Sequence, residues 1–341
     1  MSVALITGAT GLVGSHIVDR LIAGGWTVRA LVRSPQRARD ALPKSVELLN
    51  GDVLDEASFM RAARGCHSIF HTAANITVRG GWEAYRLTNV EGTRNAVAAA
   101  EASSARLLQL SSVAVYGPSG RYEAVKRGEK TDEDTPLGPL RETAYYARSK
   151  RESETMVLDA HARGRIWATA VRPTVIYGRH DRQFVPRIAV VIQRGAMPLL
   201  RGGRSMMSVV HAVNVAEGAI LAATSDIAGG KAYNLAHDYD VTVRRFFELA
   251  GEGLGTRPLL IPMPLIAARG ALRVAKWITR RMGLSIVSSS AIDFISQDNP
   301  FSSERARKEL GWRPSVRPES GVPDAFRWWK DSREKMKRAR R

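Results

Sequence analysis

The chain has 341 residues and a hydrophobic fraction of 44%, enough to bury a sizeable core in one large domain with a smaller second one. Its 51 basic and 33 acidic residues give a net charge of +18, which attracts anionic partners, but no helix-turn-helix, finger or RNA-binding signature accompanies that charge, and we predict no nucleic-acid partner. A single cysteine, Cys66, excludes an internal disulfide and a thiolate metal site, and the start at Met1 lacks the features of a secretory signal. These features predict a cytoplasmic protein.

Short β-branched segments alternate with helical segments over the first half of the chain. Strands are predicted near 3–7, 27–32, 46–50, 68–72, 106–111 and 166–171, and helices near 12–24, 55–64, 82–104 and 144–163. This alternation predicts an α/β fold, a Rossmann-type doubly wound parallel sheet covered by helices on both faces. Ligands of such sheets bind outside the carboxyl ends of the strands.

The pattern changes after about Gly178 to longer helical and loop stretches with several prolines. We predict a nucleotide-binding domain over 1–178, which 209–235 rejoins, a smaller C-terminal substrate-binding lobe mainly over 179–330, and a basic tail over 331–341. The apolar stretch 259–278 contains three basic residues and two prolines, which excludes a spanning helix. A surface helix that caps a substrate pocket is the favoured interpretation, and a peripheral membrane contact is the alternative.

A glycine-rich turn joins the first predicted strand to the first predicted helix. Gly8 permits the tight turn, Gly11 lets the backbone approach a pyrophosphate, and Gly14 allows the helix to pack closely on the strand. The strand before and the amphipathic helix after these glycines are the context that a dinucleotide site requires. The turn residues predicted to bind the cofactor are Gly8, Thr10, Gly11, Leu12, Val13 and Gly14.

The second predicted strand ends in Arg33, where an NAD-binding protein of this layout has an acidic residue. An arginine there can grip a 2′-phosphate with two hydrogen bonds, so the sequence predicts NADP(H). Arg37 and Arg39 either add charge to that site or belong to a solvated loop. After the third strand, Asp52 and Val53 are expected to contact the adenine.

Tyr146 and Lys150 stand four residues apart on a predicted helix and therefore share one face. Ser112 follows a predicted strand end, and these three residues form a candidate catalytic set.

His67, His71 and His211 lack metal-ligand spacing, so no metal is predicted. The acidic run at 132–134 is interpreted as a solvated loop.

Together with the segments Val171–Gly178 and Lys308–Pro314, these motifs resemble the extended short-chain dehydrogenase/reductase family over nearly the whole chain. The resemblance implies that Tyr146 donates the proton, that Lys150 favours the tyrosinate and holds the nicotinamide ribose, and that Ser112 orients the substrate oxygen. Ser111 is the less favoured alternative to Ser112. Further residues that the resemblance places along the cofactor are Thr72, Ala73, Ala74, Ser111, Pro173 and Val175.

Local departures from the family pattern discriminate among its members. Val113 and Ala114 stand where dehydratases have an acidic pair, and Met207 stands where sugar-nucleotide enzymes have an arginine. The second strand is especially similar to the dihydroflavonol reductase and 3β-hydroxysteroid dehydrogenase branch. We therefore predict an NADP-dependent reductase of an apolar ketone or aldehyde, either cyclic, as a steroid or flavonoid is, or long-chain. The alternatives are a nucleoside diphosphate sugar epimerase, with Arg187, Arg201 and Arg204 on the diphosphate, and a non-catalytic nucleotide-sensing protein.

The family resemblance also implies a homodimer with a four-helix interface. The helices near 82–104 and 144–163 would form it, because both carry apolar side chains. Those side chains are Val90, Val97, Ala98, Met156, Val157 and Ala160.

Overall fold

The computed structural model describes residues 1–76, 81–117, 128–264, 266 and 297–338. The chain divides into two compact units, each described by itself below. Unit 1 comprises 1–176, 212–238 and 300–315, and unit 2 comprises 177–211, 239–299 and 316–341. The chain thus passes from one unit to the other several times.

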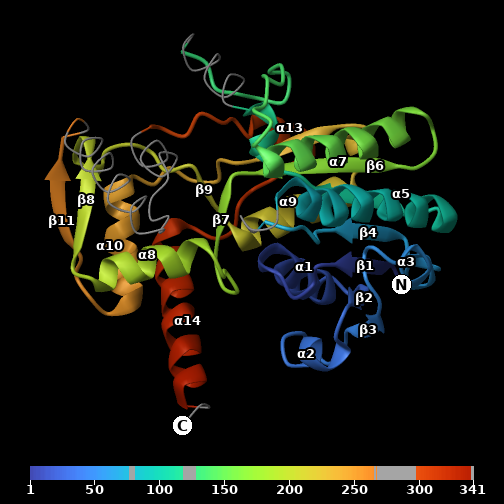
Figure 1. Ribbon diagram of the computed structural model, residues 1–341, viewed down its shortest axis with the longest axis horizontal. Coiled ribbons are helices and arrows are strands. Elements are labelled where there is room, and N and C mark those ends of the chain that lie inside the picture. Colours follow the sequence, from blue (N-terminus) through green and yellow to red (C-terminus); the bar gives the residue numbers. More distant parts are fainter. Residues whose placement is uncertain (77–80, 118–127, 265, 267–296, 339–341) are drawn as a thin grey trace. The chain divides into compact units, whose positions relative to one another are not determined.

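A seven-stranded parallel sheet forms the centre of unit 1, in the order β10-β6-β5-β4-β1-β2-β3 (Figure 1). The strands are β1 (Val3–Thr7), β2 (Thr27–Val32), β3 (Glu47–Asn50), β4 (Ser68–His71), β5 (Arg106–Leu110), β6 (Ala168–Pro173) and β10 (Ala232–Leu235). The strand order reverses direction between β1 and β4, and doubly wound sheets bind their ligands at the carboxyl ends of the strands on either side of such a reversal. The predicted parallel sheet is confirmed.

Helices cover both faces of this sheet, with α5 and α7 on one side and α1 and α9 on the other (Figure 1). The helices of unit 1 are α1 (Leu12–Ala23), α2 (Pro35–Arg39), α3 (Glu56–Ala63), α4 (Gly81–Tyr85), the π-helix η1 (Arg86–Glu91), α5 (Gly92–Ser103), η2 (Val113–Tyr116), α7 (Tyr145–Ala162), α9 (Ala212–Thr224), η4 (Asp226–Ala228) and α13 (Glu304–Leu310). The single helix predicted near 82–104 is therefore three consecutive helical segments.

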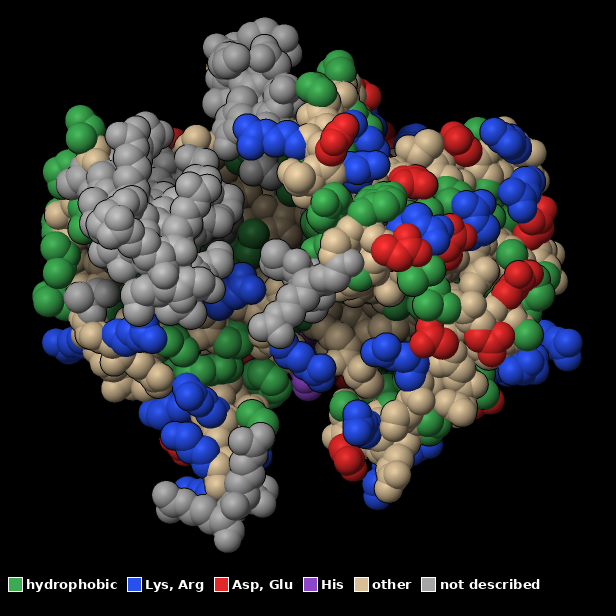
Figure 2. Space-filling view, viewed as in Figure 1, with side chains coloured by type: hydrophobic (Ala, Val, Ile, Leu, Met, Phe, Trp, Pro, Cys, Tyr) green, Lys and Arg blue, Asp and Glu red, His purple; other side chains and the backbone are tan. Residues whose placement is uncertain are grey.

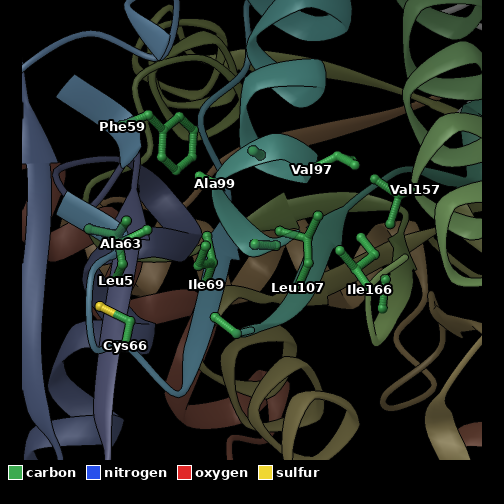
Figure 3. Packing of buried hydrophobic residues seen from close by; sticks show 14 of the residues in the cluster. Leu5, Phe59, Ala63, Cys66, Ile69, Val97, Ala99, Leu107, Val157 and Ile166 are labelled. Carbon is green, nitrogen blue, oxygen red and sulfur yellow. The ribbon is translucent and has the colours of Figure 1, made fainter. Parts of the chain in front are cut away.

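A continuous apolar core joins the sheet to the helices of one face (Figure 3). Leu5, Ile69 and Leu107 from three strands pack with Phe59 of α3 and Val97 of α5. Burial of such side chains contributes about 1.5–3 kcal/mol each, which makes this layer a major source of stability for unit 1. Cys66 lies in the same core, and burial raises the pKa of its thiol.

The segment 300–315 belongs to unit 1, whereas the sequence analysis assigned it to the C-terminal lobe. Trp312 is buried and its indole Nε1 donates to the Asn214 carbonyl at 2.9 Å. A Cβ at Gly218 would lie 3.0 Å from that indole nitrogen, so a glycine in α9 makes room for the ring. The hydropathy pattern could not reveal this return because a side-chain contact almost a hundred residues distant determines it.

Unit 2 contains α8 (Phe184–Gln193), β8 (Ala196–Leu200), η3 (Arg201–Gly203), β9 (Val209–His211), α10 (Val243–Leu254), β11 (Leu259–Met263) and α14 (Pro318–Arg338). The short strand β7 (Val175–Tyr177) leads the chain into it. Strands β8 and β11 pair in parallel. Thr242 caps α10 by accepting from the Arg245 amide, and Gly255 ends the helix in the left-handed conformation.

Aromatic rings around Phe246 of α10 form the core of unit 2. The ring centroids of Tyr177, Phe184 and Phe326 lie 5.5–6.1 Å from the ring centroid of Phe246, at the tilted or edge-on angles that aromatic pairs prefer. The last residues described, 331–338, continue α14 instead of forming the predicted tail. They are mostly exposed, and Lys and Arg gather at this end of the helix (Figure 2).

Candidate active site

The glycine turn after β1 has the close backbone approach that the sequence predicts. Gly8 adopts a φ of +69°, and a Cβ there would lie 2.8 Å from the Ala73 amide nitrogen. A Cβ at Gly14 would lie 2.3 Å from the Gly8 carbonyl oxygen. Gly11 is the N-cap of α1 and provides no side-chain cap, so the amides at this helix end can face an anionic ligand.

The second and third strands bring a different set of side chains to the same edge. Arg33 follows β2 and is exposed, as is Arg37 in α2. Arg39 instead donates to the carbonyls of Lys44 and Val46 at 3.4 and 3.2 Å, so its guanidinium holds the loop that follows α2. Two of the three arginines are thus open to a ligand, and the third serves the local fold.

Asp52 and Val53 follow β3 and are half-buried. The Oδ1 atom of Asp52 accepts from the Leu54 amide at 3.0 Å, which fixes the orientation of this carboxylate. The Val53 carbonyl accepts from the Asn95 side chain at 2.9 Å. Both residues are held in place by neighbours, at the strand end where the sequence places an adenine contact.

The segment after β4 runs beside the glycine turn. Thr72 donates its hydroxyl to the Thr7 carbonyl at 2.7 Å, and the Ala73 amide donates to the Thr7 hydroxyl at 3.3 Å. Ala74 follows and is half-buried. Ser111, directly after β5, is buried, and its hydroxyl makes no hydrogen bond among the residues that the structure describes.

The candidate catalytic set comes together in unit 1. Ser112 follows β5 as the N-cap of η2, and its Oγ accepts from the Ala114 amide at 3.2 Å. Tyr146 and Lys150 lie on α7, and the Ser112 hydroxyl is near enough to the Tyr146 phenol to act on its pKa. The structure therefore places the serine and tyrosine hydroxyls within reach of one substrate oxygen.

Burial raises the pKa of Tyr146, and the nearby Ser112 hydroxyl offsets part of that effect. The neutral phenol is consequently the stable form. The sequence analysis expected Lys150 to favour the tyrosinate; in the structure, burial beside Tyr85 has the larger effect. A protonated phenol suits a proton donor.

Lys150 is buried, and its Nζ donates to the Leu110 carbonyl at 2.6 Å. Burial lowers the pKa of Lys150 to about 8, and the charge of Glu154 acts in the opposite direction. His71 lies near enough that the lysine charge, together with burial, lowers the pKa of His71 to about 3. His71 is therefore neutral, and its Nδ1 is hydrogen-bonded to the Thr7 hydroxyl at 2.8 Å.

The sequence analysis missed Asn89, which fastens α7 to the π-helix η1. Its side-chain amide donates to the Ser149 hydroxyl at 2.9 Å, and its backbone carbonyl accepts from the hydroxyls of Thr93 and Ser153 at 2.6 Å each. Serines at 149 and 153, on the same helix as Tyr146, are the signal that could have shown a buried polar partner. This contact fixes the helix that carries the catalytic pair.

The acidic run at 132–134 is not the solvated loop that the sequence analysis expected. Glu133 is almost fully buried and accepts from the Asn234 amide at 2.6 Å. Burial raises the pKa of Glu133, whereas Arg305 pairs with Asp134 at 2.5 Å and lowers the pKa of that carboxyl. These acids fasten a loop to β10 and α13, through partners too distant in sequence to be predicted.

Unit 2 carries the features that the sequence analysis used to discriminate among substrates. Met207 is 2% exposed and belongs to the core of this unit. Arg187, Arg201 and Arg204 are exposed. Most of the apolar stretch 259–278 lies outside the described residues, so the interpretation of it as a pocket cap stays a prediction.

The apolar side chains named for a dimer interface are largely used within the protomer. Val90, Val97, Val157 and Ala160 are buried in the single chain, which leaves Ala98 and Met156 half-buried. Four of the six named side chains are therefore wrong as interface residues, because both helices bury them against the sheet and each other, and the interface itself stays a prediction. No metal-binding group of three or more His, Cys, Asp or Glu occurs among the described residues, and none of their helices is long and apolar enough to cross a membrane.

Residues 4–236 match the model of the NAD dependent epimerase/dehydratase family. The chain belongs to this family. One relative is a 4-hydroxy-2-methyl-3-oxo-4-farnesyl-3,4-dihydroquinoline-1-oxide ketoreductase of Stigmatella aurantiaca. The two sequences are 30% identical over an alignment that covers 94% of this chain and 95% of the relative. Another relative is a 3-beta-hydroxysteroid dehydrogenase of Mycolicibacterium neoaurum. It is 29% identical to this chain, over 96% of this chain and 91% of the relative.

The fold is similar to that of a UDP-glucose 4-epimerase of Thermus thermophilus, solved in complex with NAD. The TM-score is 0.71 at 23% identity, over 96% of this chain and 99% of the other. These comparisons confirm the expected family, the Rossmann-type fold and the class of activity, NAD(P)-dependent oxidoreduction at a ketone or alcohol carbon.

Proposed function

We propose that this oxidoreductase uses NADPH to reduce an apolar, ring-bearing ketone or aldehyde to the alcohol. The observation that carries the proposal is the arrangement of Ser112, Tyr146 and Lys150: the Ser112 hydroxyl acts on the pKa of the Tyr146 phenol, and the buried Lys150 lies one turn further along the same helix. Bound NADPH would supply the hydride to the carbonyl carbon. The residues of the chain then have to manage the negative charge that develops on oxygen.

Tyr146 donates its phenolic proton to that oxygen, which becomes the hydroxyl of the product. Because the pKa of this phenol is raised, the proton is present at neutral pH. Ser112 accepts from the Ala114 amide, which fixes its oxygen, and its hydroxyl hydrogen is the second donor to the substrate oxygen. The two hydroxyls act together as proton donor and oxyanion donor.

Lys150 has two proposed roles: it would bind the cofactor, and it provides the positive charge of the site. Its Nζ uses one hydrogen on the Leu110 carbonyl, and an ammonium has three, so two remain for the ribose hydroxyls of the cofactor. The glycines at 8 and 14 leave space that a Cβ would fill, and the amides at the start of α1 suit the pyrophosphate. The residues present therefore fit a dinucleotide.

We assign NADP(H) instead of NAD(H) on the basis of Arg33 and Arg37. Both are exposed beside the end of β2, where the 2′-phosphate of an adenine ribose would lie in a sheet of this kind. A guanidinium matches a phosphate with two hydrogen bonds. Asp52, Val53, Thr72, Ala73, Ala74, Ser111, Pro173 and Val175 complete the proposed cofactor site.

The substrate class rests on the relatives and on unit 2. One relative is named for a farnesyl-bearing quinoline ketone and another for a hydroxysteroid, and both names describe apolar, ring-bearing compounds. Met207 is buried where sugar-nucleotide enzymes that resemble this chain have an arginine. Val113 is buried in η2, and Ala114 lacks a group for acid or base chemistry, which argues against dehydration.

We further propose that the enzyme is a cytoplasmic homodimer. The one cysteine is a buried free thiol, which fits a reducing compartment. The exposed sides of α5 and α7, including Ala98 and Met156, are the proposed interface. Analytical ultracentrifugation at micromolar concentration tests this directly, and a monomer would contradict it.

A panel of ketones and nucleoside diphosphate sugars tests the main proposal. We expect NADPH consumption with one or more apolar cyclic ketones and none with the sugars. A Tyr146→Phe variant serves as the inactive control. Turnover of a sugar nucleotide alone would make the protein an epimerase.

A further inference from the structure

A buried ion pair lies one helical turn beyond the catalytic lysine. Glu154 follows Lys150 by four residues on α7, so the two side chains share a face of the helix, and both are buried. Arg172, at the end of β6, places its Nε 3.1 and 3.0 Å from the two carboxylate oxygens of Glu154. Its Nη2 lies 2.5 Å from Oε1, so the carboxylate has one fixed orientation.

The other side of the same guanidinium is also held. Nη1 of Arg172 donates to the Tyr116 hydroxyl at 2.9 Å, and this hydroxyl donates to the Asn234 side-chain oxygen at 2.9 Å. Burial raises the pKa of Tyr116 to about 12, so the phenol is neutral. Glu133 reaches this network through the Asn234 amide. The guanidinium is thus held directly from α7 and η2, and through Tyr116 from β10, which keeps the ion pair in place.

An ion pair of this kind is not explained by stability alone, because well-packed apolar residues of similar volume often stabilise a core as well or better. Its position suggests another reason. Lys150 lies near the neutral His71 of β4 and donates to the Leu110 carbonyl of β5, and Tyr146 stands one turn before it on α7. Glu154 supplies the negative charge that counteracts the effect of burial on the lysine.

We infer that Glu154 is a positioning residue for the reduction: held by Arg172, it keeps a fixed negative charge beside Lys150 and so retains that lysine in its charged form at neutral pH. The effect on turnover rests on the proposed function. The charge state of the lysine, however, can be measured without any substrate. The two failures can therefore be distinguished.

The direct test is a pH titration of Lys150 by NMR on the full chain carrying lysine labelled with ¹³C at Cε. The chain has ten lysines, and the resonance of Lys150 is the one absent from a Lys150→Arg variant. In Glu154→Gln, an isosteric neutral variant, we expect the titration midpoint to fall by about one pH unit or more, because the nearby negative charge is lost. Glu152→Gln, on the exposed side of the same helix, should leave the midpoint unchanged.

Glu154→Gln also leaves the Arg172 cation unpaired, which could prevent folding. A double variant, Glu154→Gln with Arg172→Met, removes both charges and avoids this outcome. We expect it to fold and to show a midpoint below that of the wild type, but by less than in Glu154→Gln, because the positive charge of Arg172 is lost together with the negative charge of Glu154. An unchanged Lys150 midpoint in either folded variant would overturn the inference.

Activity gives the second measurement. The wild-type value of kcat/KM for the reduction should fall above about pH 8, where Lys150 loses its proton before Tyr146 does. In Glu154→Gln this decline should begin about one pH unit lower, and Glu154→Asp should restore part of the difference. A purely structural role would reduce the folded fraction and leave the pH profile in place. If the wild type reduces no carbonyl, the proposed function fails and the NMR titration still decides the inference.

Discussion

The two units of the molecule differ in net charge and in how many of the proposed site residues they contain. Unit 1 has 28 basic and 23 acidic residues, a net charge of +5, whereas the smaller unit 2 has 23 and 10, a net charge of +13. Every residue assigned to the cofactor or to catalysis lies in unit 1. Unit 2 contains Met207, one of the residues from which the substrate class was argued, whereas Val113 and Ala114 lie in unit 1. We therefore propose that unit 1 determines the type of reaction and that unit 2 contributes to the choice of substrate.

This difference follows from the physical demands on each unit. A dinucleotide and a proton transfer require glycines, a phenol and an ammonium at set places on a sheet, so few sequences satisfy them. An apolar substrate requires only a suitable apolar surface, which many sequences provide. The positive charge of unit 2 is compatible with an apolar substrate. It also makes an anionic compound the main alternative to a neutral ketone as the substrate.

Loss of the unit 1 ammonium should have the largest effect. We expect Lys150→Met to lower kcat by about 10²- to 10⁴-fold and to weaken NADPH binding as well, because Lys150 serves both the proton transfer and the ribose. Stopped-flow kinetics and fluorescence titration measure the two effects. Wild-type affinity for NADPH in this variant would mean that the lysine does not hold the cofactor.

Gly14→Ala should disturb the glycine turn itself. The new Cβ would lie 2.3 Å from the Gly8 carbonyl oxygen, and overpacking of this kind costs about 1–3 kcal/mol of the free energy of unfolding. Urea denaturation measures the change. Gly24→Ala, at the other end of α1, is the matched control, because its nearest neighbour would be 3.4 Å away and the cost should be small.

Arg33→Asp should reverse the cofactor preference by about 1–3 kcal/mol, since a charge-assisted pair with the 2′-phosphate is replaced by repulsion. Isothermal titration with NADPH and NADH measures it. Arg39→Gln should leave the preference unchanged, because Arg39 is engaged with the loop after α2. Equal affinities of the wild type for both cofactors would remove the basis of the assignment.

Salt should have the smallest effect, and it tests unit 2. A neutral ketone has no charge to be screened, so its KM should change by less than about twofold between about 20 and 500 mM salt, while the KM for NADPH rises. A ketone KM that rises as steeply as that of NADPH would show that the basic surface of unit 2 recognises an anionic substrate.

The sheet and its glycine turn could be predicted because local features determine them. The strand at 27–32 and the turn at Gly8 depend on β-branched runs and on a glycine that close backbone contact requires. The segment 300–315 and the buried acid Glu133 could not be predicted in the same way. Their partners, Asn214 and Asn234, are separated from them by about a hundred residues, and no local pattern reports such a contact.

The shared helix face of Tyr146 and Lys150 was predictable from spacing, and Ser112 became a candidate through the family resemblance, but their surroundings were not predictable. The four-residue step from Tyr146 to Lys150 predicts a shared helix face, and a further step of four leads to Glu154, which the same periodicity could have revealed. The ion pair with Arg172 and the raised pKa of Tyr146 depend on burial, which a sequence pattern does not quantify.

The central claim is that Tyr146 protonates the carbonyl oxygen as hydride arrives from NADPH. The most direct measurement is single-turnover transfer of deuterium from 4-deuterated NADPH to a ketone substrate, in the wild type and in Tyr146→Phe. We predict deuterium at the carbinol carbon in the wild type and a rate at least about 10²-fold lower in the variant, with unchanged NADPH affinity. Transfer at the wild-type rate in Tyr146→Phe would contradict the account.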